Sequence, residues 1–87
     1  MHAVVIRFKV NDRLALQAQV DEAIAEVSAE PGFVAAYWVA LERDEAMSVV
    51  VYESEQTAAM AALAANVAEH SAFTAGTPET GEVIAHA

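Results

Sequence analysis

The sequence of 87 residues contains no cysteine. Disulfide bonds, thiolate nucleophiles, iron–sulfur clusters and cysteine-based zinc sites are therefore excluded. The longest wholly apolar stretch near the N-terminus, residues 3–6, is far shorter than a signal-peptide core or a membrane span. Both observations favour a protein of the reducing cytoplasm, and we expect a cytoplasmic location.

Cations and glycines are also scarce. Four Lys and Arg residues face thirteen Asp and Glu residues, a formal charge of −9, which disfavours nucleic acid and anionic membrane surfaces as partners. Three glycines leave no glycine-rich phosphate loop, and no Gly-x-Ser-x-Gly motif of a serine hydrolase is present. The three histidines, His2, His70 and His86, have no metal-ligand spacing, so we expect neither a metal nor a cofactor.

Apolar residues, in contrast, are abundant. A chain of this length builds one hydrophobic core, so residues 1–87 are expected to form a single domain. Hydrophobic residues make up 56% of the sequence, more than so small a monomer hides comfortably. The composition therefore favours self-association.

The N-terminal half predicts a strand, a helix and a hairpin. Residues 3–10 are rich in β-branched and aromatic residues and alternate in their second half, which predicts a strand. Asn11-Asp12 supplies a turn and a cap for a helix over 13–29. That helix ends at Glu30-Pro31-Gly32, and its predicted apolar stripe is Leu16, Val20, Ile24 and Val27. Residues 33–42 and 46–53 then form two strands joined through the charged segment 43–45.

The C-terminal half predicts a helix, a loop and a last strand. Ser54 caps a helix from Glu55 to about residue 70. Its predicted buried stripe is Met60, Leu63, Ala64 and Val67. Residues 71–81, with Gly76 and Pro78, predict a loop, and residues 82–86 a short fourth strand.

This βαββαβ order predicts an α+β fold with both helices on one face of an antiparallel four-stranded sheet, because such crossovers are right-handed. The other face has no cover within the chain. Residues 33–41 and 47–52 are nevertheless apolar on both sides of their strands. A second copy of the same sheet is the simplest cover, so we expect a homodimer.

Three short segments carry a resemblance over nearly the whole chain: residues 2–10, the Pro31-Gly32-Phe33 entry to the second strand, and Glu69-His70-Ser71-Ala72-Phe73. In these the sequence resembles the dimeric α/β-barrel superfamily, specifically small antibiotic-biosynthesis-monooxygenase-like proteins. The resemblance implies a ferredoxin-like domain, a dimeric barrel, and a cavity between sheet and helices. It also implies that relatives include cofactor-independent oxygenases and haem-degrading proteins. Haem degradation is not expected here, since the first strand has Arg7 where those relatives carry asparagine, and the tryptophan lies in the second strand instead of near the second helix.

Aromatic residues are the candidates for substrate binding. Trp38, in the middle of the second strand, faces either the helices or the dimer interface, and it either packs a core or stacks on a planar aromatic ligand. Tyr37 and Tyr52 allow the same two interpretations, and a buried phenol also needs a hydrogen-bond partner. Phe73 belongs to the segment of the resemblance.

Arg7 and His70 are the catalytic candidates. Arg7 alternates with the apolar row of the first strand, where it either pairs with a carboxylate or stabilises an enolate or phenolate. His70 either caps the second helix electrostatically or removes a phenolic proton, the role that the resemblance suggests.

Two functions follow. The first is a cofactor-independent, monooxygenase-like protein that oxidises a small aromatic or polyketide compound, with His70 as base and Arg7 as anion stabiliser. The alternative is a non-catalytic homodimer that binds a small apolar ligand or serves a stress or regulatory role. Converging polar groups beside an aromatic wall would favour the first function, and a cavity packed with alanine and valine would favour the second.

Overall fold

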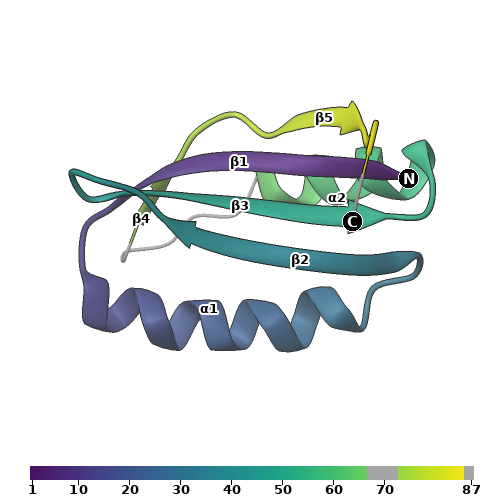
Figure 1. Ribbon diagram of the computed structural model, residues 1–87. Helices are drawn as coiled ribbons and strands as arrows, with labels where there is room; N and C mark the ends of the chain where they lie inside the picture. Colours follow the sequence, from purple (N-terminus) through teal and green to yellow (C-terminus); the bar gives the residue numbers. More distant parts are fainter. Residues whose placement is uncertain (67–72, 86–87) are drawn as a thin grey trace.

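The computed structural model describes residues 1–66 and 73–85 and confirms the ferredoxin-like βαββαβ order (Figure 1). Two helices are interleaved with the strands along the chain, and the strands form one antiparallel sheet. The elements are β1 (His2–Val10), α1 (Arg13–Ser28), β2 (Phe33–Ala40), β3 (Glu45–Tyr52), α2 (Glu55–Asn66), β4 (Phe73–Ala75) and β5 (Glu79–Glu82).

The fourth strand of the sheet is split in two. The order is β2-β3-β1, and both β4 and β5 pair antiparallel with the remaining edge of β1. The predicted loop over 71–81 is wrong for residues 73–75 and 79–81, which are strands, and the predicted strand over 82–86 is wrong for residues 83–85. Gly76 begins the short connection between β4 and β5 and is held close to β1: its N–H donates to the Arg7 carbonyl oxygen at 2.7 Å, and a Cβ there would lie 2.9 Å from that oxygen.

Local side-chain and turn chemistry explains where the helices and the hairpin begin. The Asp12 carboxylate accepts from the N–H groups of Leu14 and Ala15 at 3.0 and 3.2 Å, which confirms the predicted cap of α1. Ser54 Oγ accepts from the Thr57 N–H at 3.2 Å and caps α2. Arg43 and Asp44 join β2 to β3 with φ of 59° and 58°, the left-handed pair typical of a tight hairpin turn.

The hydrophobic core lies between the sheet and the two helices, which confirms that both helices cover one face. One buried cluster joins Val4, Val50 and Tyr52 to Ala58 of α2, and Val27 of α1 packs against it. A second cluster contains Phe8, Val10 and Ala46, with Leu16 of α1 and Trp38 packed against it. In Figure 1, α1 runs along β2, and α2 lies behind β1 and β3.

The helix α2 is rotated relative to the predicted stripe. Ala58 has no exposed surface, and Ala61 and Ala62 pack beside it, whereas Met60 and Leu63 are 65% and 71% exposed. The predicted stripe of large residues was therefore wrong for Met60 and Leu63; Val67 lies outside the described residues. Small side chains face the sheet because they allow the helix backbone to approach it closely.

The helix α1 keeps most of its predicted stripe but packs less deeply. Leu16, Val20 and Val27 are partly buried, Ile24 is 47% exposed, and no residue of the helix is fully buried. The open face of the sheet, opposite the helices, carries an apolar surface formed by Ala3, Val5, Ala35, Tyr37, Val39, Met47, Val49 and Val51. This surface has no cover within the described chain.

Candidate functional site

Trp38 lies on the helix-facing side of the sheet. It stands opposite Ser48, which in turn stands opposite Ile6, so these three residues form one cross-strand row. Ser48 is buried, and Trp38 packs against the cluster that also receives Leu16 from α1. Trp38 remains partly exposed. Of the two orientations that the sequence left open, the structure shows the one in which the indole faces the helices.

Tyr52 lies on the same side as Trp38 but at the end of β3, in the row of Phe33 and His2. It is 2% exposed, and its hydroxyl donates to Glu30 Oε2 at 2.9 Å. Burial, followed by the hydrogen bond to Glu30 and the negative charge of that residue, raises the pKa of Tyr52 above its usual range. The phenol thus has its partner in the linker between α1 and β2.

Arg7 and Tyr37 lie on the open face. Tyr37 is 63% exposed, and Arg7 stands opposite Met47 in the next cross-strand row. The sheet therefore separates these two candidates from Trp38 and Tyr52, and the residues do not line one cavity of a single protomer.

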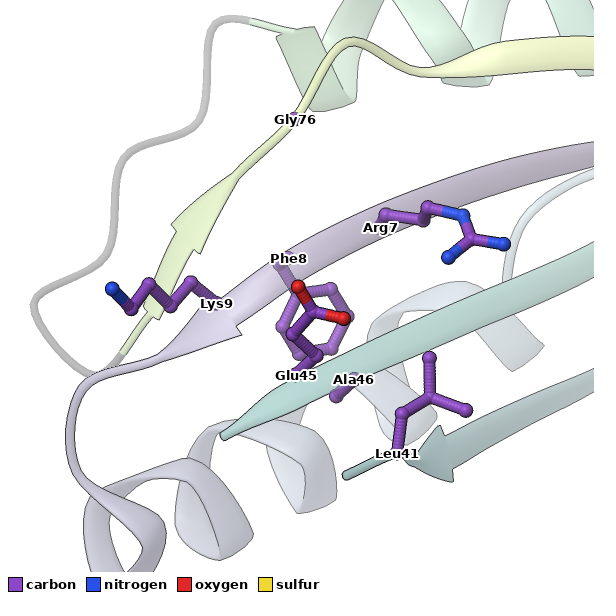
Figure 2. A pocket seen from close by; sticks show the side chains of 7 residues that line it. All are labelled: Arg7, Phe8, Lys9, Leu41, Glu45, Ala46 and Gly76. Atoms are coloured by element: carbon purple, nitrogen blue, oxygen red, sulfur yellow. The ribbon is translucent and has the colours of Figure 1, made fainter. Parts of the chain in front are cut away.

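A pocket of about 320 Å³ lies beside Arg7 at the end of β1 (Figure 2). Arg7 and Lys9 extend in opposite directions along β1, with Glu45 between them. Neither cation forms an ion pair with a described residue. The ion pair found among the described residues joins Arg13 to Asp44 at 3.7 Å. The pocket is lined by Arg7, Phe8, Lys9, Leu41, Glu45, Ala46 and Gly76.

Two candidate residues, His70 and Phe73, cannot be placed in the site. His70 lies outside the described residues, and so does the side chain of Phe73, whose backbone pairs with Val10 in β4. Within residues 1–66 and 73–85, no group of three or more His, Asp or Glu side chains is arranged to hold a metal ion. In the same part of the chain, no helix is long and apolar enough to cross a membrane.

Gln19 is a residue that the sequence analysis did not single out. The partly buried side of α1 consists of Ala15, Leu16, Gln19, Val20, Ala23 and Val27, in which Gln19 is the one polar member. Its Oε1 atom is buried and has no hydrogen-bond partner among the described residues. The sequence feature that could have indicated this residue is a glutamine one helical turn after Leu16, on the side of the helix predicted to face the sheet.

Comparison with known proteins supports the fold. The structure is similar to that of the heme-degrader MhuD from Mycobacterium tuberculosis, solved with two hemes bound in its active site. The TM-score is 0.61 at 16% sequence identity, and the match covers 100% of this chain and 99% of MhuD. No family model and no curated protein matches the sequence. At this identity the likeness establishes a shared ferredoxin-like fold over the whole chain.

Proposed function

We propose that the chain is a homodimeric, monooxygenase-like protein that binds a small planar aromatic compound between α1 and the sheet. The observation that carries this proposal is the placement of Trp38 on the helix-facing side, partly exposed and beside Leu16. An indole face stacks favourably on a flat ring. The shared fold with MhuD supports a monooxygenase-like relationship without defining a substrate.

The packing of α1 supports a ligand at this place. The helix has no fully buried residue, although it lies over an otherwise apolar sheet surface. Its packed side chains therefore keep part of their surface exposed. An aromatic ligand beside Trp38 would cover apolar surface there, which is favourable.

The proposed reaction is the oxidation of a phenol by molecular oxygen. His70 would remove the phenolic proton, and the electron-rich ring would react with oxygen. One oxygen atom enters the ring to give a quinone, and the other leaves as water. Arg7 lies on the opposite side of the sheet from Trp38. We therefore assign it to the dimer face instead of to this ligand.

A non-catalytic binding role is the second candidate. Trp38 belongs to the apolar cluster of Phe8, Val10, Ala46, Ile6 and Leu16, and it stands opposite the uncharged Ser48. The acid–base chemistry proposed above therefore depends on His70, which lies outside the described residues. A protein that holds an aromatic compound without converting it needs no such group.

An oxygen-consumption assay separates the two candidates. A panel of phenols is offered to the purified protein and to the His70→Ala variant, and binding is measured in parallel by calorimetry. Consumption by the parent protein that disappears in the variant supports the oxygenase. Binding without consumption supports the second candidate, and the absence of binding by every phenol contradicts both.

Haem is expected to be a poor ligand. Arg7 and Lys9 lie on the open face, Arg13 at the start of α1 and Arg43 in the β2–β3 turn, so none of these cations lies beside Trp38 to bind a propionate. A hemin titration followed by the Soret absorbance should show no saturable complex at micromolar protein. A stoichiometric complex would overturn this expectation and bring the protein closer to MhuD in function.

The homodimer is proposed to form through the open face. Val49 lies in the centre of that face, between Val5 and Tyr37. A Val49→Asp substitution should convert the dimer to a monomer in light scattering, because it buries an unpaired carboxylate in the interface. The matched control is Leu14→Asp at an 89% exposed position of α1. Dissociation in the control, or an intact Val49→Asp dimer, would contradict the interface.

A further inference from the structure

We propose that Gln19 is a ligand-binding residue that receives the hydroxyl group of a neutral phenol or related aromatic alcohol lying against Trp38. This inference rests on the proposed function and narrows its ligand to a class: uncharged aromatic compounds with a hydrogen-bond donor. It is carried by the buried Oε1 atom of Gln19, which has no partner among the described residues.

An unpaired buried carbonyl oxygen is unfavourable. Removing a carbonyl oxygen from water without replacing its hydrogen bond destabilises the folded state, and most buried polar groups therefore have partners. Gln19 interrupts the apolar side of α1, where leucine or methionine would pack without this cost. A glutamine at this position is thus better explained by a partner that joins later than by the stability of the free protein.

The geometry of α1 places Gln19 level with Trp38. Leu16 packs near Phe8 and Ala46 at one end of the sheet, and Val27 packs on the Val4–Val50–Tyr52 cluster nearer the other end. Gln19 lies one turn from Leu16 toward Val27, a step of about 4.5 Å along the helix axis. Trp38 stands in the cross-strand row between these two ends. The amide and the indole therefore approach the same part of the interface between α1 and the sheet.

The chemistry of the surroundings selects a neutral donor. Trp38 belongs to an apolar cluster and stands opposite the uncharged Ser48, and the four Lys and Arg residues of the chain lie elsewhere: Arg7 and Lys9 on the open face, Arg13 at the start of α1, and Arg43 in the β2–β3 turn. A carboxylate ligand would find no countercharge among these residues. A hydroxyl group fits, because it donates to Oε1 and can also accept from the amide nitrogen.

Two probes of nearly equal size test the hydroxyl group. Calorimetry compares 2-naphthol with 2-methoxynaphthalene, whose ether oxygen cannot donate, and 2-naphthoate is added as an anionic probe. The expected result is that 2-naphthol binds the parent protein about tenfold more tightly than either of the others. Gln19→Met should bring the two neutral probes to equal affinity.

Gln17→Met is the matched control, because Gln17 is exposed on the same helix and its amide donates to Asp21 at 3.2 Å. It should leave the preference for 2-naphthol unchanged. A second measurement concerns the ligand-free protein: Gln19→Met should have an equal or higher melting temperature, since it removes an unpaired buried group. A marked loss of stability would show that Gln19 is satisfied within the fold and would overturn the proposal.

The failures can be told apart. The first failure concerns Gln19 alone. In that case both neutral probes bind the parent protein with equal affinity, bind Trp38→Phe more weakly, and bind Gln19→Met as tightly as the parent. This result supports the binding site beside Trp38 and refutes the role of Gln19. If 2-naphthoate binds most tightly, the assignment to neutral compounds is refuted. If no probe binds, the proposed function and this inference both fail.

Discussion

The helix α2 places Ala58 against the sheet with no exposed surface, whereas α1 leaves every residue of its packed side partly exposed. The side chains that face the sheet differ in size. Alanines at 58, 61 and 62 face it from α2, and the packed side of α1 includes the larger Leu16, Gln19 and Val20. A small sheet can thus carry one helix with a fully buried residue in the core and another whose packed side remains partly exposed.

Enlarging one alanine on each helix should give the largest difference in stability between the two helices. Ala58→Leu is expected to lower the free energy of unfolding by about 2–3 kcal/mol, because a fully buried position has no space for three more carbon atoms. Ala23→Leu, on the partly buried side of α1, should cost no more than about 0.5 kcal/mol. Urea denaturation measures both, and equal losses would show that the helices pack alike.

The hydrogen bond from Tyr52 to Glu30 links the cluster under α2 to the segment that follows α1. Tyr52→Phe should therefore lower the free energy of unfolding by about 1.5 kcal/mol, since it removes a hydrogen bond to a charged acceptor and leaves the Glu30 carboxylate without this donor. Tyr37→Phe is the matched control: it keeps the aromatic ring on the face proposed for the dimer and removes a hydroxyl that has no hydrogen-bond partner among the described residues, so it should change little. A similar loss in the control would indicate that both phenols are structural.

The same tyrosine predicts a dependence on pH. The pKa of Tyr52 is raised in the folded state, so its contribution to stability is complete below the unfolded value of about 10. It is lost as the pH rises from there through the folded pKa, because the unfolded chain releases the proton first. Urea denaturation above pH 10 should show stability falling more steeply for the parent protein than for Tyr52→Phe. Parallel pH profiles would contradict this.

The caps of the helices provide the smallest and most local test. Asp12→Ala should cost about 1 kcal/mol and speed hydrogen exchange along α1, because two N–H groups lose their acceptor. Ser54→Ala should have its effect on the first turn of α2, with the deeper turns held by the alanine packing. Asp12→Asn keeps an acceptor and serves as control. Uniform exchange in Asp12→Ala would mean that α1 opens together with the core.

The sequence predicted what is determined locally or by alternation. The caps at Asp12 and Ser54, the hairpin through Arg43 and Asp44, and the covering of one face by both helices depend on near neighbours and on strand period. The rotation of α2 was not predictable in this way. Periodicity favours the larger Met60 and Leu63, but close approach to the sheet selected the smaller Ala58 and its neighbours.

The candidate site was predicted in part. Trp38 could not be assigned to a face, because a shift of one residue in strand register reverses every side chain. Gln19 was not predicted, because a single glutamine on an amphipathic helix is common. It becomes a candidate only when the structure shows that its Oε1 atom is buried without a partner among the described residues. The split between β4 and β5 was missed because Gly76 and Pro78 are typical loop residues, while the close contact to Arg7 requires tertiary structure.

The position of β2 at the edge of the sheet has a consequence for aggregation. Its eight residues, Phe33–Ala40, contain no charge, and one long side of the strand lacks a strand partner in the described chain. Such a segment readily adds further strands from other molecules. Protection comes from α1, which runs alongside it, and from the charged residues that flank it: Glu30 before the strand, and Glu42, Arg43, Asp44 and Glu45 after it. The helix α1 therefore also shields an uncharged edge strand from other molecules. If the proposed ligand binds between α1 and the sheet, it should hold α1 in place and slow aggregation in concentrated solution.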